Sequence, residues 1–309
     1  MSARAVWPAV IGAAGARLAY GALRAAPPGG AARWERTNHR GERITLLEGP
    51  AVALGGIAGV LAAPADGRAR AAMAIAGAGA AAFGGYDDLN GNAASRGFRG
   101  HLGALRSGEL TTGAVKLAGI GSTGLAAALL AAPPGQRRLT AVADVVINAG
   151  LIAGGANLVN LFDLRPGRAI KAALAAAGLL APARGGAALA APVAAAVALL
   201  PEDLGERSML GDAGANALGA MIGTAAALGL PRGARVATLG VVIGLTVASE
   251  YVSFTAVIER TAPLRWLDQL GRRPVPGQSG SAAPGSAGSG WAAAASLAAG
   301  PESSEPRHA

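Results

Sequence analysis

The stretch ARAAMAIAGAGAAAFGGYDD (residues 69–88) joins a long apolar run to two adjacent aspartates. Arg70 is its only charged residue before Asp87, so its length and apolarity predict a helix that crosses a membrane. The C-terminal end of a helix carries partial negative charge, and each carboxylate placed there costs about 0.3–1 kcal/mol. Asp87 and Asp88 therefore need a partner, most simply a cation.

The composition of the whole chain is that of a membrane protein. Of its 309 residues, 52% are hydrophobic and 15% are charged, whereas soluble domains carry about 25% charged residues. There are no cysteines, which excludes disulfides and thiolate metal sites. The net charge of +9 lies mostly in short loops between apolar spans, and only 4% of the residues are aromatic. This pattern argues against nucleic acid as a partner and favours membrane lipid and phosphate groups.

Windows of about 20 residues predict nine membrane spans. The spans lie at 5–23, 45–63, 69–86, 111–131, 139–161, 168–182, 186–200, 213–230 and 235–258. The predicted fold class is therefore all-α, a polytopic transmembrane bundle of about nine to ten helices with an active site on its cytoplasmic face. Residues 1–270 form this membrane domain, and residues 271–309 form a Pro/Gly/Ser-rich tail that cannot bury enough surface to fold.

Small residues recur four positions apart within three of the predicted spans. They occur in GGIAG (55–59), GLIAG (150–154) and GAMIG (219–223). Such residues let the backbones of two membrane helices approach closely, so these segments are expected at helix contacts.

The distribution of basic residues predicts the orientation of the chain. Most of the 27 Lys and Arg residues lie in the loops that follow the odd-numbered spans. By the positive-inside rule these loops and the C-terminal tail are cytoplasmic, and the N-terminus is outside. Four carboxylates from three separate loops then share the cytoplasmic face, namely those of Asp87, Asp88, Asp163 and Asp212.

Oxygen ligands at separate helix ends suit Mg²⁺, with Mn²⁺ as the alternative ion. Basic groups surround the four carboxylates in sequence, and carboxylates, a divalent cation and arginines are what phosphoryl transfer requires. Three structural alternatives stay open. Asp87 and Asp88 could be the start of a solvated loop. Asp212 could simply cap the helix that starts beside it, and Asp163 could pair with Arg165 or Arg168 at the membrane surface.

Three segments resemble, in the same order, motifs of the polyprenyl-phosphate phospho-sugar transferases (glycosyltransferase family 4). They are GGYDDLNGNAASRGFRGH (84–101), ANLVNLFDLRPGRA (156–169) and MLGDAGANALGAMIG (209–223). The resemblance covers most of residues 35–260. It implies an enzyme of cell-envelope glycan biosynthesis that moves a sugar-1-phosphate from a nucleotide-sugar, expected to be a UDP-sugar, to a polyprenyl (undecaprenyl) phosphate with Mg²⁺.

The resemblance also implies roles for individual residues. Asp212 and Asp88 would bind the metal, Asp87 or Asp88 would activate or position the lipid phosphate, and Asp163 would complete the catalytic cluster. The substrate-binding residues would be Asn157 and Asn160 at the nucleotide, with Arg96, Arg99, His101, Lys116, Arg165 and Arg168 at the phosphates and their surroundings. A homodimer stays open.

Two departures from the family pattern bear on the donor substrate. The family usually reads N-x-x-D-G-x-D-G, whereas residues 160–167 read NLFDLRPG, with Leu164 at the first glycine and Pro166 at the second aspartate. The family's late histidine motif is also missing, since the chain has only His39, His101 and His308. Two other functions stay open: a weakly active or inactive relative that binds polyprenyl phosphate or a partner enzyme, and a transporter.

Overall fold

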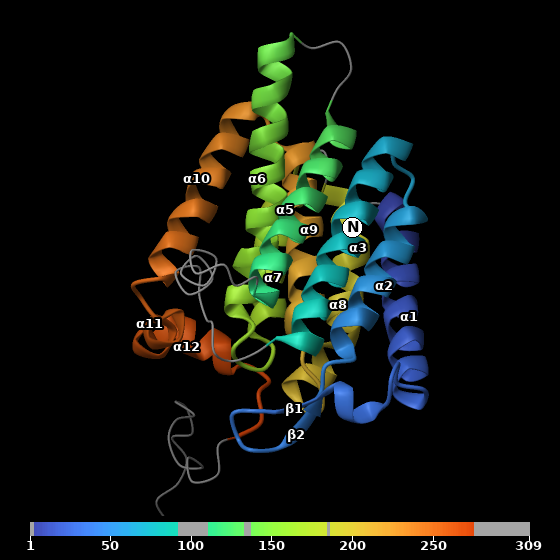
Figure 1. The fold of residues 1–309 in the computed structure, drawn as a ribbon, viewed down its shortest axis with the longest axis vertical. Helices are drawn as coiled ribbons and strands as arrows, with labels where there is room; N and C mark the ends of the chain where they lie inside the picture. The colour runs from blue at the N-terminus through green and yellow to red at the C-terminus, as the bar shows by residue number, and fades with distance from the viewer. Residues whose placement is uncertain (1–2, 92–110, 133–136, 184–185, 275–309) are drawn as a thin grey trace, which may run out of the picture. The chain divides into compact units, whose positions relative to one another are not determined.

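The computed structural model describes residues 3–91, 111–132, 137–183 and 186–274, and these form eleven α-helices with one short β-hairpin (Figure 1). The helices are α1 (Ala3–Ala25), α2 (Glu48–Leu61), α3 (Gly67–Asn90), α5 (Thr112–Ala131), α6 (Arg138–Phe162), α7 (Arg168–Leu180), α8 (Ala190–Leu204), α9 (Gly211–Gly229), α10 (Arg232–Ser249), α11 (Phe254–Arg260) and α12 (Ala262–Gln269). Two 3₁₀ turns, η1 (Ala31–Arg33) and η2 (Gly186–Leu189), and strands β1 (Glu35–Thr37) and β2 (Arg43–Thr45) complete the described elements.

Five of the described helices are long and apolar enough to cross a membrane. They are α1, α5, α6, α10 and the continuous helix formed by η2 and α8. A helix also lies in each of the other predicted span ranges, but α2 and α7 have only 14 and 13 residues. At 1.5 Å per residue they are shorter than the roughly 30 Å of a bilayer core. The chain is thus a candidate multi-pass membrane protein with fewer clear spans than the sequence predicts.

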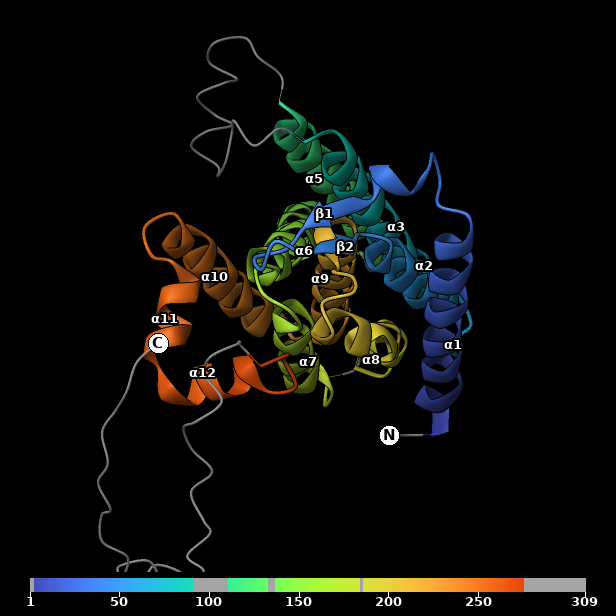
Figure 2. The same ribbon diagram turned by 90° about the horizontal axis from the view of Figure 1, so that it is seen from below.

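Helix α9 lies at the centre of the bundle and is buried along almost its whole length. It packs most extensively against α6 and α3 and also touches α2 and α7, and the view from below shows these helices around it (Figure 2). A β-carbon added at Gly219 or Gly223 would come within 2.2–2.3 Å of a backbone oxygen of α6. The GAMIG segment therefore allows direct backbone contact, as its spacing predicts.

The other two small-residue segments also lie at helix contacts. A β-carbon at Gly55 or Gly59 would meet backbone atoms of α1 at 2.4–2.5 Å, so GGIAG joins α2 to α1. In GLIAG, β-carbons at Gly150 and Gly154 would meet the side chains of Leu239 and Val242 on α10 at 3.0 and 2.7 Å. GAMIG and GGIAG confirm the prediction of close backbone approach, whereas GLIAG lies at a helix contact that is made with side chains.

The last predicted span, 235–258, is not one helix. Helix α10 ends at Ser249, and α11 starts at Phe254 after Ser253, whose hydroxyl accepts a hydrogen bond from the backbone N–H of Ala256. Ser253 is a helix N-cap, a role that serine favours because its oxygen satisfies an otherwise unpaired N–H. Helix α12 then follows, and the sequence did not predict it.

The β-hairpin was not predicted either. Asn38 closes its turn, because the Oδ1 atom of Asn38 accepts hydrogen bonds from the backbone N–H groups of Arg40 and Glu42, both at 2.9 Å. Gly41 has a φ of 81°, which glycine adopts without strain. Arg273, which the sequence assigns to the tail, pairs with Glu42 at 2.5 Å.

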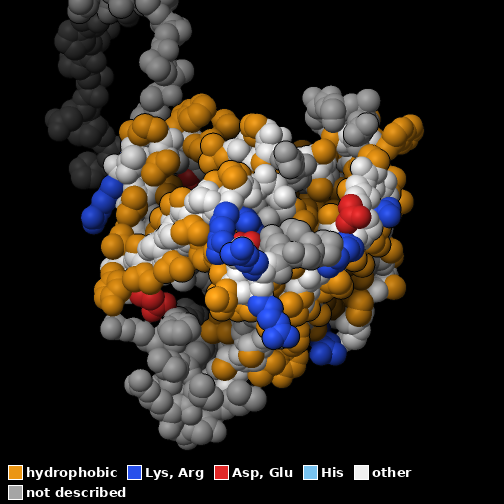
Figure 3. All heavy atoms as spheres, turned by 90° about the horizontal axis from the view of Figure 1, so that it is seen from above, with side chains coloured by type: hydrophobic (Ala, Val, Ile, Leu, Met, Phe, Trp, Pro, Cys, Tyr) orange, Lys and Arg blue, Asp and Glu red, His pale blue; other side chains and the backbone are white. Residues whose placement is uncertain are grey.

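The two ends of the bundle differ in chemistry. Figure 3 looks onto the end far from the hairpin, where apolar side chains surround a few small groups of charged ones. Arg232 and Arg235 pair there with Asp144 at 3.3 and 3.4 Å. The hairpin, α11 and α12 lie at the other end (Figure 1), where the predicted site residues Asp87, Asp88, Asp163 and Asp212 also lie.

Candidate functional site

Asp88 joins the C-terminal end of α3 to the N-terminal end of α9. Its Oδ1 and Oδ2 atoms accept hydrogen bonds from the backbone N–H groups of Asp212 at 3.0 Å and Ala213 at 2.9 Å. The first N–H groups of a helix carry partial positive charge, so this carboxylate lies in a favourable field at the start of α9. It does so although it also lies at the C-terminal end of α3, where a negative charge is unfavourable. The Arg36 guanidinium also donates a hydrogen bond to the backbone carbonyl of Asp88.

Lys116 is the cation partner of Asp87, one member of the aspartate pair, and of Asp212. Its Nζ atom lies 2.7 Å from Oδ2 of Asp87 and 2.5 Å from Oδ2 of Asp212. The three side chains come from α3, α5 and α9, and each is between 16% and 24% exposed. Lys116 therefore bridges Asp87 and Asp212, which are 125 residues apart in sequence. The predicted clustering of Asp87, Asp88 and Asp212 is present.

Asp163 follows α6 and belongs to the same end of the bundle. The backbone N–H of Gly211 donates a hydrogen bond to its carboxylate, while its Oδ2 atom is buried without a hydrogen-bond partner among the described residues. In the described part of the chain Asp163 makes no ion pair with Arg165 or Arg168, and Asp212 lies in the first turn of α9 without capping it. These two structural alternatives from the sequence are thus not seen.

If all four carboxylates were ionised, they would carry more negative charge than the cations beside them could balance. Burial, then the charge of Asp212, raises the pKa of Asp88 to about 7. Burial, then the charges of Asp203, Asp212 and Asp88, raises the pKa of Asp163 well above its ordinary value. Burial also favours the neutral form of Asp87, but hydrogen bonds from Lys116 and Thr112 outweigh it, so the pKa of Asp87 is lowered. A divalent cation would relieve this excess of negative charge.

A Mg²⁺ ion bound by the described residues of this cluster would have few protein ligands. Among the described residues no group of three or more His, Asp or Glu side chains could hold a metal ion. Mg²⁺ commonly takes only one or two carboxylates and completes its shell with water and substrate phosphate. Asp212 and Asp88 can provide those two carboxylates, and the unpartnered Oδ2 atom of Asp163 could accept a hydrogen bond from a metal-bound water.

A cavity of about 220 Å³ opens beside Asp163. The loop between α6 and α7, the hairpin turn and the end of α8 line it, with residues that include Asp163, Arg165, Pro166, His39 and Asp203. This volume is below the 300–1,000 Å³ that a drug-sized ligand occupies. The cavity is therefore of a size for a single small group.

The remaining predicted substrate-binding residues fall into different places. Arg165 lines the cavity. Asn157 Nδ2 lies 3.5 Å from the hydroxyl of Thr246 on α10, and Asn160 lies in the last turn of α6, where its carbonyl accepts from the Asp163 N–H. Arg168 is 4% exposed and paired with a carboxylate of α12. Arg96, Arg99 and His101 lie outside the described residues.

Arg168 already binds two other side chains of the protein, so the structure does not support its predicted contact with phosphate. Its Nε and Nη2 atoms donate to the two carboxylate oxygens of Asp268 at 2.7 and 3.1 Å, and Nη1 donates to the hydroxyl of Thr255 at 2.8 Å. The guanidinium thereby anchors α11 and α12 to the start of α7. No sequence signal pointed to this role, because the partner lies 100 residues away on an unpredicted helix.

Sequence reasoning missed three polar residues beside the site. Glu48 is fully buried, and Ser208 donates a hydrogen bond to its Oε2 atom at 2.5 Å. Asp203 is 2% exposed and has one oxygen without a partner among the described residues. Glu48 had a usable signal, since a carboxylate inside a predicted span is a default candidate for function.

Comparisons with known proteins add no relative. No protein-family model matches the chain, and no curated protein matches it.

Proposed function

We propose that this protein is a multi-pass membrane transferase that moves a sugar-1-phosphate from a nucleotide-sugar to a polyprenyl phosphate, with Mg²⁺. The observation that carries the proposal is the bridge that Lys116 makes between Asp87 and Asp212, with Asp88 hydrogen-bonded beside it. Carboxylates and a lysine from three helices meet at one end of an apolar bundle. Such a group can position phosphates and compensate their charge.

In the proposed reaction an oxygen of the lipid phosphate attacks the sugar-linked phosphorus of the donor, and the nucleoside monophosphate leaves. Asp87 is suited to accept the remaining proton of the lipid phosphate, because Lys116 and Thr112 favour its ionised form. Lys116 can turn to a phosphate oxygen as the charge of the reactants enters the site. Besides its proposed contact with the metal, Asp88 fixes the first turn of α9 and with it Asp212.

Asp212 and Asp88 are the proposed metal ligands, and the ion would supply positive charge that stabilises the transferring phosphoryl group. The cavity beside Asp163 is the proposed place for one ring of the donor, with Arg165 near its phosphates. Because Pro166 supplies no carboxylate and no N–H, we propose loose recognition of the nucleotide base.

The direct test uses the purified full chain with undecaprenyl phosphate and a panel of UDP- and TDP-sugars. Release of nucleoside monophosphate that requires both lipid phosphate and Mg²⁺, and that EDTA abolishes, is the expected result. Absence of turnover with every donor, in protein that still binds Mg²⁺ and lipid phosphate, would contradict the enzyme proposal.

A second candidate function is a non-catalytic protein that binds polyprenyl phosphate. It is favoured because polar groups of the cluster already have partners within the protein. Lys116 pairs with two carboxylates, and Asp88 accepts hydrogen bonds from two backbone N–H groups. This candidate predicts binding of undecaprenyl phosphate without turnover, so the same assay separates the two functions.

We further propose that the cluster faces the cytoplasm and that the N-terminus is outside. Support comes from the Lys and Arg residues of the loops at this end. Because the chain has no cysteine, Arg43→Cys and Leu139→Cys, at side chains exposed on opposite ends, allow a clean labelling test in intact cells. An impermeant thiol reagent should reach residue 139 and not residue 43.

A further inference from the structure

We propose that a second pocket, at the end of α1, binds the phosphate of an anionic membrane lipid. This pocket has a volume of about 260 Å³ and is lined by residues of α1, the following loop, the hairpin, α2 and the loop after α8. None of its lining residues belongs to the acidic cluster, so the proposal does not rest on transferase activity.

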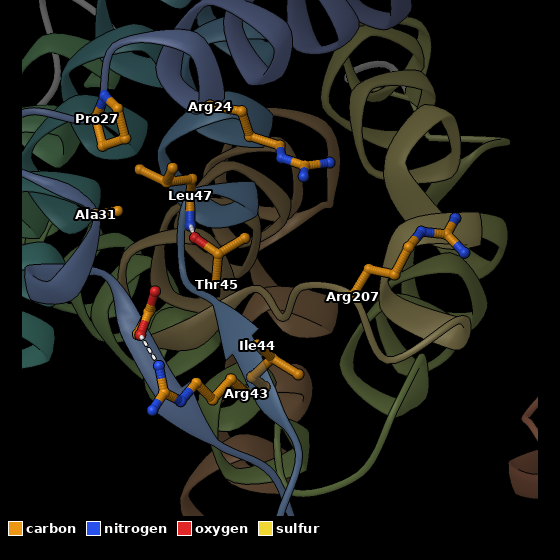
Figure 4. Close-up of a pocket in the computed structure, with 9 residues that line it drawn as sticks. Arg24, Pro27, Ala31, Arg43, Ile44, Thr45, Leu47 and Arg207 are labelled. Carbon is orange, nitrogen blue, oxygen red and sulfur yellow. Dashed lines mark hydrogen bonds and ion pairs between the residues drawn. The ribbon is translucent and has the colours of Figure 1, made fainter.

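Three arginines from separate elements surround the pocket (Figure 4). Arg24 lies in the last turn of α1, Arg43 in β2, and Arg207 in the loop after α8. A single arginine at a helix end would be explained by the helix dipole. Three arginines from distant parts of the chain line this one pocket, and although their guanidinium groups point in different directions in Figure 4, an anion bound there would explain why they lie together.

The local charge is not balanced by the protein. Arg207 shares Glu202 with Arg17, at 2.7 and 2.9 Å respectively, and Arg43 lies 3.7 Å from Glu35. The lining of the pocket itself holds three arginines and one carboxylate, that of Glu35, which leaves a net charge of +2. Arginine is the side chain best suited to hold phosphate, because its planar guanidinium can donate two parallel hydrogen bonds.

Tyr20 lies beside Arg24 but is not among the residues that line the pocket. The Arg24 guanidinium lies 5.7 Å from the centre of the Tyr20 ring, within the range of a cation–π contact. This contact supports the position of Arg24 at the edge of the pocket.

The position and the inner wall of the pocket favour a lipid over a soluble phosphate. Helix α1 is a candidate membrane span that ends at Ala25, so Arg24 lies where a bilayer core would give way to headgroups. Pro27, Ile44 and Leu47 also line the pocket and give it apolar surface. A lipid presents phosphate and apolar chain together, which matches this arrangement of charge and apolar surface.

The test is native mass spectrometry of the full chain in detergent, titrated with phosphatidylglycerol, phosphatidylcholine or glycerol 1-phosphate. The wild-type protein should bind phosphatidylglycerol most tightly. Arg24→Gln should weaken that binding roughly fivefold, and Arg24→Gln with Arg207→Gln by more than tenfold, since each arginine near an anionic surface contributes about this factor. Arg24→Lys should retain most of the affinity.

Arg260→Gln is the matched control, because Arg260 is exposed on α11 at the same end of the bundle and lies outside the pocket. Its affinity for phosphatidylglycerol should equal that of the wild type. The proposal is overturned if the Arg24 and Arg207 variants bind phosphatidylglycerol as the control does. It is also overturned if glycerol 1-phosphate binds as tightly as the lipid, which would assign the pocket to a soluble phosphate.

Discussion

The carboxylate of Asp88 accepts a hydrogen bond from the backbone N–H of Asp212 at 3.0 Å, across 124 residues of sequence. The most unfavourable carboxylate of α3 thereby becomes the N-terminal cap of α9. The same contact places Asp212 within reach of Lys116 and Asp87. The geometry of the candidate site therefore depends on how closely α3 and α9 approach each other.

Asp88 is expected to matter for function beyond its contribution as a helix cap. Asp88→Asn keeps an oxygen that can accept from the α9 N–H groups but removes the charge. It should stay folded while release of nucleoside monophosphate falls roughly a hundredfold or more. Asp66 offers a matched control, since it caps α3 by accepting from the N–H groups of Arg68 and Ala69, far from the cluster.

Asp66→Ala and Asp88→Ala should each destabilise the protein by about 1 kcal/mol, measured by thermal unfolding in detergent. Only the change at Asp88 should abolish activity. Equal activity in the two alanine variants would reduce Asp88 to a structural cap.

Lys116 is expected to stabilise the cluster in the absence of metal. Lys116→Met leaves Asp87 and Asp212 close together without a cation and should lower the free energy of unfolding by about 2–3 kcal/mol. Adding Asp212→Asn to Lys116→Met should recover part of that loss, because one of the two charges is then gone. Thermal unfolding of the wild type, both single variants and the double variant gives the coupling energy. No coupling between the two positions would contradict the bridge.

The stability of the metal-free protein should depend on pH through Asp88. Burial and Asp212 raise the pKa of Asp88 from its ordinary value of 3.8 to about 7, so the folded state binds a proton that the unfolded chain has released. Stability contributed by this proton is present below about pH 4 and is lost as the pH rises to about 7, by at most about 1.4 kcal/mol per pH unit. Denaturation is measured at several pH values in EDTA. The free energy of unfolding of the wild type minus that of Asp88→Asn should fall as the pH rises. A difference that rises with pH would contradict the buried position of this carboxylate.

Much of the helical framework could be predicted from the sequence, because apolar length and small-residue spacing are local signals. The convergence of Asp87, Asp88 and Asp212 could be predicted from the sequence, because all three lie in loops that follow odd-numbered predicted spans. The resemblance to the transferase motifs predicts it as well. The partner of Arg168 could not, because Asp268 lies on α12, a helix of 8 residues whose polar and apolar residues alternate too briefly to stand out. The hairpin depends on the Asn38 turn and on backbone pairing, neither of which leaves a hydrophobic pattern.

Arg168 is expected to act through α12. If its guanidinium serves only to anchor that helix, Arg168→Gln and Asp268→Asn should have the same effects. Both should increase proteolytic cleavage between α10 and residue 274, and both should change turnover to the same extent. A phosphate-binding role predicts a different result, in which Arg168→Gln raises the KM for the donor and Asp268→Asn does not.

Gly84 tests whether the close approach of α3 and α9 sets the geometry of the site. A β-carbon at Gly84 would lie 2.3 Å from the backbone oxygen of Asp212, so Gly84→Ala must push the two helices apart. Gly85 is the matched control, since its β-carbon would meet only Ala213 Cβ at an ordinary 3.6 Å. Both changes carry the same gain in helix propensity, about 0.5–1 kcal/mol.

Gly85→Ala should therefore keep or raise the melting temperature and keep activity. Gly84→Ala should lower activity by roughly a hundredfold, because a displacement of about 1 Å in a positioned site costs that much. The measurement is release of nucleoside monophosphate beside thermal unfolding for both variants. If Gly84→Ala retains the activity of Gly85→Ala, the contact between α3 and α9 does not control the site.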